Sequence, residues 1–278
     1  MLKSVYISIF FALLLFNGPL AYSKVKSNVN VKLYSSQSVI SPGDEIQLAV
    51  EFRIKNQWHI YWENPGDAGM ATTLEFTLPE GFKVGRVLYP YPSKCKTEGL
   101  TSFGYKDNAV LLTKIKVPDY LQKDENYKIK IKAIWLECKH ICIPGETELE
   151  ITLKAKEGAK TKKVNSFKNY LRNIPKSLAG LDAQMSMTEQ SAILNLKFPD
   201  FLDQNSLSFD IFPLNETIFV HSQKPKIKKD KNGFSIELDF DPFKVDIPEK
   251  LEFVLVIDEK NAKIIDSKSI YFKVNTRN

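Results

Sequence analysis

The chain has 278 residues, of which 43% are hydrophobic and 26% charged, and it carries a formal net charge of +6. This length suggests two domains of ordinary size, and a mild charge spread along the chain does not favour a nucleic-acid-binding protein. The lysine-rich stretches 154–163 and 224–231 lack interleaved aromatic residues, which indicates solvated linker or loop rather than a binding surface.

Residues 1–23 have the pattern of a cleaved export signal. A short basic start precedes an apolar run over residues 7–15, and the small residues Ala21 and Ser23 lie where a signal peptidase would cut. The apolar run is short for a membrane span, although an uncleaved anchor is the alternative, and no later segment approaches 18 apolar residues. We expect an exported protein that begins near Lys24 and is peripheral to a membrane at most.

Residues 24–155 are predicted to form a β-rich domain. Short runs alternate apolar and polar residues, which is typical of strands that bury one face, and turn residues separate them at 41–44 and 79–81. The predicted strands include 29–33, 45–50, 109–115 and 127–135.

Residues 156–178 are predicted to be a lysine-rich linker with a short helix. The helical spacing of Phe167, Tyr170 and Leu171 ends at Pro175. Residues 179–278 then resume the strand pattern. Many short strands at this spacing predict an all-β protein with two immunoglobulin-like β-sandwich domains in tandem. The later predicted strands are 192–198, 207–212, 234–240, 251–257 and 269–274.

Two of the three cysteines, Cys138 and Cys142, follow the alternating stretch 127–135 directly. In a straight strand they would lie about 13 Å apart, whereas a disulfide needs Cα atoms within about 7 Å. A tight hairpin with residues 139–141 at its tip would place them opposite each other at an exposed end. A disulfide that closes a loop of five residues stabilises a fold by only about 2 kcal/mol, which favours a redox role over a structural brace.

Two other roles for this segment stay open. Cys138, His140 and Cys142 are soft or borderline ligands that would suit Cu(I) or Zn(II), and His59 could complete the set. Alternatively, the chain is a non-enzymatic binding or adapter protein with a structural disulfide. The third cysteine, Cys95, is an inert thiol, a resolving thiol or an intermolecular partner. No cofactor is expected, because hydrolase and P-loop motifs are lacking.

The segment from Trp135 through Cys138 and Cys142 to Pro144 resembles the active-site hairpin of the N-terminal periplasmic domain of DsbD-type thiol:disulfide interchange proteins. Other segments within residues 28–153 resemble the ScsB-like subgroup, which also carries a second β-sandwich that corresponds to residues 165–278. DsbD itself spaces its cysteines further apart, so the ScsB-like proteins are the better analogue. The resembling segments are 57–69, 72–74, 78–82, 89–90 and 103–105.

This resemblance implies a periplasmic protein-disulfide reductase, or a component of one, in which Cys138 and Cys142 exchange electrons. The donor would be a separate membrane-embedded protein of the DsbD or CcdA type, because the sequence contains no membrane or thioredoxin-like domain. The clients would be periplasmic thioredoxin-like or disulfide-isomerase proteins, in processes such as cytochrome c biogenesis and copper tolerance.

The resemblance also assigns supporting roles around the cysteine pair. Phe103 and Tyr105 would be aromatic residues of a mobile cap loop over the disulfide, and His59 and Tyr61 would be polar aromatic residues beside it. His140 could favour a thiolate at a neighbouring cysteine by lending positive charge. Core packing is the alternative for Phe103, Tyr105 and Tyr61, and an exposed loop position is the alternative for His140.

Overall fold

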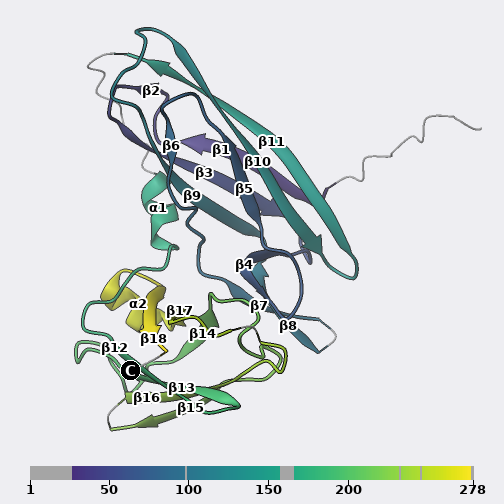
Figure 1. The fold of residues 1–278 in the computed structure, drawn as a ribbon, viewed down its shortest axis with the longest axis vertical. Coiled ribbons are helices and arrows are strands. Elements are labelled where there is room, and N and C mark those ends of the chain that lie inside the picture. Colours follow the sequence, from purple (N-terminus) through teal and green to yellow (C-terminus); the bar gives the residue numbers. More distant parts are fainter. Residues whose placement is uncertain (1–26, 98, 157–165, 232, 245, 277–278) are drawn as a thin grey trace, which may run out of the picture.

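The computed structural model describes residues 27–97, 99–156, 166–231, 233–244 and 246–276. The expected export signal and most of the lysine-rich linker lie outside the described residues. Two groups of strands are stacked along the long axis of the molecule, and β4, β7 and β8 lie between them (Figure 1). No helix in the described part of the chain is long and apolar enough to cross a membrane.

The N-terminal domain, β1 to β11, contains two four-stranded sheets with the orders β1-β3-β9-β6 and β2-β11-β10-β5. Alternate residues of β3 and β10, such as Leu48, Phe52 and Ile131, meet in one core between these sheets. The strands are β1 (Val29–Ser35), β2 (Val39–Ile40), β3 (Glu45–Ile54), β4 (Ile60–Gly66), β5 (Thr73–Thr77), β6 (Lys83–Val84), β7 (Ser93–Thr97), β8 (Leu100–Tyr105), β9 (Asn108–Lys116), β10 (Asn126–Cys138) and β11 (Cys142–Ala155).

The C-terminal domain, β12 to β18, packs the sheet β12-β13-β16-β15 against the sheet β14-β17-β18. Its core is separate from the first one and is rich in phenylalanine, with Phe198, Phe219 and Phe253 fully buried. The strands are β12 (Asp182–Met187), β13 (Ser191–Lys197), β14 (Phe209–Pro213), β15 (Lys226–Asp230), β16 (Gly233–Asp239), β17 (Lys250–Ile257) and β18 (Ser269–Asn275). The prediction of an all-β, immunoglobulin-like fold with a short helix is confirmed, while the exact domain boundaries stay a prediction.

The predicted short helix is α1 (Ser166–Arg172), which covers the outer face of the first sheet. Phe167 lies in this helix and Ile174 lies just beyond its end. Both pack against Ala49 of β3 and Leu112 of β9. This contact explains why both faces of β3 carry buried residues. A second helix, α2 (Glu259–Ile265), was not predicted, and Asp258 caps its first turn by accepting a hydrogen bond from the backbone N–H of Asn261.

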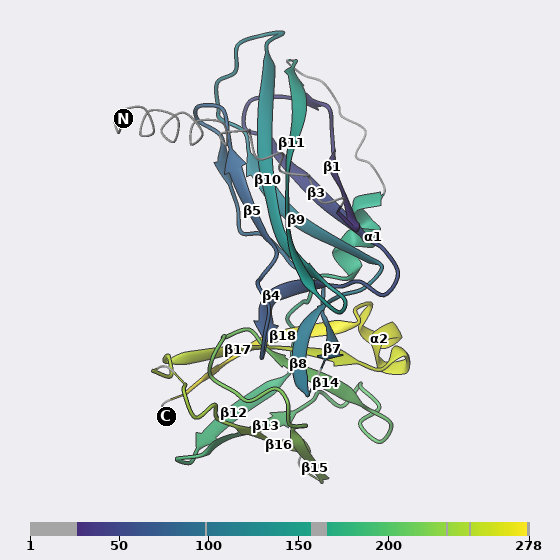
Figure 2. The same cartoon turned by 90° about the vertical axis from the view of Figure 1, so that its right-hand side faces the viewer.

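A third sheet, β4-β8-β7, connects the two domains, and β14 of the C-terminal domain lies against it (Figure 2). The ring of Phe212 from β14 lies edge-on to Trp62 and Phe103, with ring centroids 6.2 and 5.1 Å away. Asn64 of β4 is fully buried and donates a hydrogen bond of 2.9 Å to the carbonyl of Pro213. The domains therefore share apolar and polar contacts.

Candidate redox site

The site lies at the end of the long hairpin of β10 and β11. The two strands pair in register from Asn126 and Lys154 to Cys138 and Cys142, which form the last pair. Their sulfur atoms are joined in a disulfide, and their Cα atoms are 4.2 Å apart. The backbone N–H of Lys139 donates to the carbonyl of Ile141 and so closes the three-residue tip. The hairpin expected from the sequence is thus confirmed.

The two sulfur-bearing residues have different surroundings. Cys138 is only 3% exposed, because its backbone exchanges hydrogen bonds of 2.9 and 3.0 Å with His59 just before β4. Cys142, on the other strand, is exposed, and the neighbouring Ile141 is 66% exposed. An external thiolate can therefore reach Cys142 more readily than Cys138.

Tyr61 of β4 contacts the disulfide through its hydroxyl. Its hydroxyl donates a hydrogen bond of 3.1 Å to Sγ of Cys138 and lies 3.9 Å from Sγ of Cys142. Gly69 permits this position, since any side chain there would collide with the Tyr61 ring. Burial, with a smaller contribution from nearby Cys95, raises the pKa of Tyr61, so its hydroxyl stays protonated and able to donate.

His59 packs edge-on against Tyr61, with ring centroids 5.2 Å apart. Burial and the positive charge of Lys106 lower the pKa of His59, so its ring is neutral at neutral pH. His59 thus contributes backbone pairing and packing to the site but no positive charge.

A cavity of about 310 Å³ lies beside the hairpin tip, and we call it the basic cavity. It contains the buried free thiol of Cys95, whose pKa is raised by burial. Of the residues that the structure describes, no carboxylate lines this cavity, so its electrostatic potential favours anions. The lining residues are Gln57, His59, Cys95, Lys96, Lys106, Lys139 and His140.

Glu137 is a residue of the site that the sequence reasoning missed. It is fully buried at an inward position of β10 and accepts hydrogen bonds from Ser27, from both nitrogens of Asn28 and from Trp135, at 2.7 to 3.0 Å. Burial would raise the pKa of Glu137, but these bonds outweigh it and hold the pKa below its ordinary value. The sequence did contain a signal for this residue, because Glu137 falls among the alternate positions of β10 that otherwise hold buried apolar side chains. Glu137 thus binds the start of the described chain to the tip end of the hairpin, next to Cys138.

Phe103 and Tyr105 lie in strand β8, and both rings belong to the core of the N-terminal domain. Phe103 contacts Trp62, Phe212 and His221, and the Tyr105 hydroxyl donates to the carbonyl of Pro90. The structure thus places both residues in a strand rather than in a loop, because β7 and β8 form a regular hairpin there. A capping role for them stays a prediction.

The proposed metal ligands are not arranged as a metal site. Cys138 and Cys142 are joined to each other, and His140 is exposed on the tip. Within the described ranges, no group of three or more His, Cys, Asp or Glu side chains could hold a metal ion.

Comparisons with known proteins agree with this geometry. Residues 30–154 match the family model for the N-terminal domain of thiol:disulfide interchange protein DsbD. This part of the chain is therefore similar to the DsbD N-terminal domains, as the sequence motifs indicated. A search of curated protein sequences found no match.

Among solved structures, the chain is similar to the N-terminal periplasmic domain of ScsB from Proteus mirabilis, with 14% identity and a TM-score of 0.63. The similarity covers 90% of this chain and 95% of the other, so it includes both β-sandwiches. The reduced N-terminal domain of DsbD from Neisseria meningitidis is also 14% identical and covers 44% of this chain and 88% of that one, with a TM-score of 0.27. The ScsB comparison establishes the fold of the two-domain unit.

Proposed function

We propose that this protein is a periplasmic thiol–disulfide exchange module that carries electrons through the Cys138–Cys142 pair. The observation that carries this proposal is a disulfide between adjacent strands, at the tip of a hairpin in a DsbD N-terminal domain, with one exposed and one buried cysteine. Such a bond closes only a short loop and contributes little to stability, whereas its position gives a partner access.

In the exchange reaction, a thiolate of the donor protein attacks Sγ of the exposed Cys142. A mixed disulfide forms between the donor and Cys142, and Cys138 leaves as a thiolate. The hydroxyl of Tyr61, 3.1 Å from that sulfur, stabilises the leaving charge. A second donor thiol then attacks the donor's own sulfur in the mixed disulfide, which releases Cys142 and leaves both cysteines reduced. The reverse sequence, with a client disulfide, oxidises the pair again.

The surroundings of the hairpin tip support a partner with a negatively charged contact surface. Lys96, Lys106 and Lys139 line the basic cavity, and none of them forms an ion pair with a described residue. Complementary charge raises the rate of association between proteins and orients them. We propose a membrane-embedded electron donor of the DsbD type and thioredoxin-like or disulfide-isomerase clients. Roles in cytochrome c biogenesis and copper tolerance stay predictions.

The first experiment measures the reduction potential of the Cys138–Cys142 pair in glutathione buffers, with alkylation and intact mass as the readout. An exchange module should have a potential between about −180 and −270 mV, whereas a value below about −300 mV is typical of a structural disulfide. The second outcome would replace the exchange function with that of an adapter braced by a disulfide.

Single-cysteine variants test the order of attack, in a Cys95→Ala background that leaves one reactive thiol. Cys138→Ser should form a mixed disulfide rapidly with a small aromatic disulfide reagent, because Cys142 is exposed. Cys142→Ser should react at least ten-fold more slowly, because Cys138 is buried under His59 and Tyr61. Equal rates would contradict the proposed order without affecting the proposed function.

A further inference from the structure

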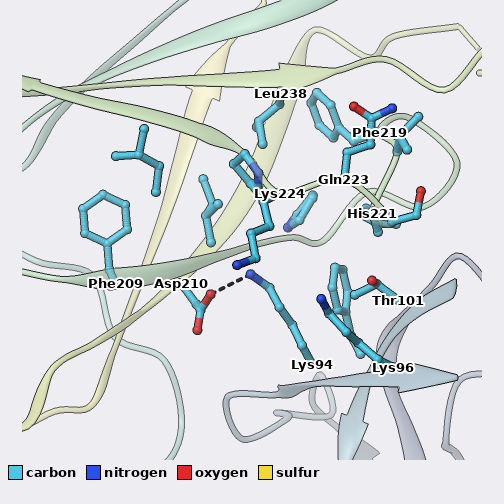
Figure 3. Close-up of a pocket in the computed structure, with 17 residues that line it drawn as sticks. Lys94, Lys96, Thr101, Phe209, Asp210, Phe219, His221, Gln223, Lys224 and Leu238 are labelled. Carbon is cyan, nitrogen blue, oxygen red and sulfur yellow. Dashed lines mark hydrogen bonds and ion pairs between the residues drawn. The ribbon is translucent and has the colours of Figure 1, made fainter. Parts of the chain in front are cut away.

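A second cavity, of about 270 Å³, lies between the two domains. It shares Lys96 with the basic cavity, but no step of the exchange reaction takes place in it. Figure 3 shows that Lys94, Lys96 and Thr101 approach it from the N-terminal domain, while Lys224 extends from the C-terminal domain. We call it the interdomain cavity. It is smaller than most pockets for drug-sized ligands, which measure roughly 300–1,000 Å³.

Apolar side chains form most of its wall. Phe103, Phe219 and Leu238 are buried in the domain cores and line the cavity, and Ile227, which is 44% exposed, extends the wall to the surface. Burial of an apolar ligand against such a wall is favourable, because it removes apolar surface from water. The wall therefore selects a ligand with an apolar body.

Positive charge dominates the polar part of the lining, which holds three lysines and one aspartate. Lys94 pairs with Asp210 at 2.6 Å, whereas Lys96 and Lys224 have no ion pair with any residue in the described ranges. His221 adds no charge at neutral pH, because burial lowers its pKa more than Asp67 and Asp241 raise it. Two ammonium groups are thus available to an anion.

From this combination we infer that the interdomain cavity binds a small amphipathic anion, with an apolar body the size of an aromatic ring or a short branched chain and a single carboxylate. The apolar wall would hold the body, and Lys96 and Lys224 would hold the carboxylate. Each lysine ammonium is a compact point charge that can donate hydrogen bonds to a carboxylate oxygen. The site involves both domains, so the ligand would also strengthen their contact.

Calorimetric titration of the complete oxidised protein tests the inference with phenylacetate, isovalerate and indoleacetate as probes. At least one of them should bind with one-to-one stoichiometry and a Kd of roughly a millimolar, as expected for a ligand of about ten heavy atoms. The neutral analogue phenylacetamide should bind at least five-fold more weakly than phenylacetate.

Two variants locate the binding, each with a matched control outside the cavity. Lys224→Gln should weaken binding at least three-fold, and Ile227→Asp, which places a carboxylate on the apolar wall, should weaken it more than ten-fold. The controls Lys228→Gln and Ile264→Asp change exposed residues that do not line the cavity and should leave the affinity unchanged.

The inference is overturned if none of the three carboxylates binds, if the amide binds as tightly as the acid, or if both cavity variants retain full affinity. Binding of an acidic dipeptide in the absence of binding by the three probes would identify the occupant as a segment of a partner protein, which also overturns it. None of these results depends on the reduction potential of Cys138 and Cys142, so the inference can fail while the proposed function holds.

Discussion

The hydroxyl of Tyr61 donates a hydrogen bond of 3.1 Å to Sγ of Cys138, the buried member of the cysteine pair. This bond becomes stronger when Cys138 carries the negative charge of a thiolate, because charge-assisted hydrogen bonds are about twice as strong as neutral ones. Tyr61 is therefore placed to assist departure of Cys138 when Cys142 is attacked.

Replacement of Tyr61 by phenylalanine should slow reduction of the disulfide. A hydrogen bond to a charged group contributes about 1.5–3 kcal/mol, so the rate of reduction by dithiothreitol should fall roughly ten- to one-hundred-fold. Stopped-flow fluorescence or quenched alkylation gives this rate. The matched control is Tyr127→Phe on the far end of β10, whose hydroxyl accepts a hydrogen bond from the backbone of Gln122 and should not affect the rate. An unchanged rate in Tyr61→Phe would remove the hydroxyl from the mechanism.

The hairpin around the cysteines was predictable because alternation in β10 fixes both the strand and the direction of its side chains. The difference in exposure between Cys138 and Cys142 was not predictable, since it arises from the pairing of Cys138 with His59, a residue 79 positions earlier in the numbering. Likewise, Phe103 matched a family position in sequence, but the ring that it packs against, Phe212, comes from the other domain. Local patterns define strands, whereas contacts between distant segments define the site.

The buried carboxylate of Glu137 should make stability depend on pH. Replacement by glutamine keeps the size but leaves the Trp135 N–H or a neighbouring donor without an acceptor, at a cost of about 1–3 kcal/mol in the free energy of unfolding. Urea denaturation at neutral pH measures this difference. Glu148→Gln, at an exposed position of β11, is the control and should have almost no effect.

The sign of the pH effect follows from the lowered pKa of Glu137. The folded protein binds this proton more weakly than the unfolded chain does, so the stabilisation is complete above the ordinary pKa of 4.5 and is lost as the pH falls through the lower, folded value. The free energies of unfolding of the wild type and Glu137→Gln, measured by urea denaturation at a series of pH values, should therefore converge as the pH falls below 4.5. Curves that stay parallel would show that the ionised carboxylate is not the stabilising form.

Cys95 should be much less reactive in the native state than Cys142, the exposed member of the reduced pair. Its side chain is buried, and burial raises its pKa, so little thiolate is present at neutral pH. Iodoacetamide should label the exposed Cys142 in the reduced protein before it labels Cys95, as mass spectrometry of peptides would show. Rapid labelling of Cys95 in the oxidised protein would mean that strand β7 opens readily.

Reduction of the disulfide should leave the fold intact. Closure of a five-residue loop accounts for about 2 kcal/mol of stability, whereas two separate cores hold the domains. Thermal unfolding with and without a reductant should therefore show a modest decrease in Tm without loss of cooperativity. Unfolding on reduction at room temperature would instead identify the bond as a structural brace.

The C-terminal domain should stabilise the sheet that carries Tyr61. Phe212 is 1% exposed, and its ring fills the space beside Trp62 and Phe103, so Phe212→Ala should lower the free energy of unfolding by about 3–5 kcal/mol. Since Tyr61 and Trp62 are neighbours in β4, the loosened sheet should also hold the Tyr61 hydroxyl less firmly against Cys138, and reduction should slow. Phe243→Ala is the matched control, because that ring is 91% exposed. If Phe212→Ala is less stable but its disulfide is reduced at the wild-type rate, the C-terminal domain stabilises the fold without affecting the reactivity of the disulfide.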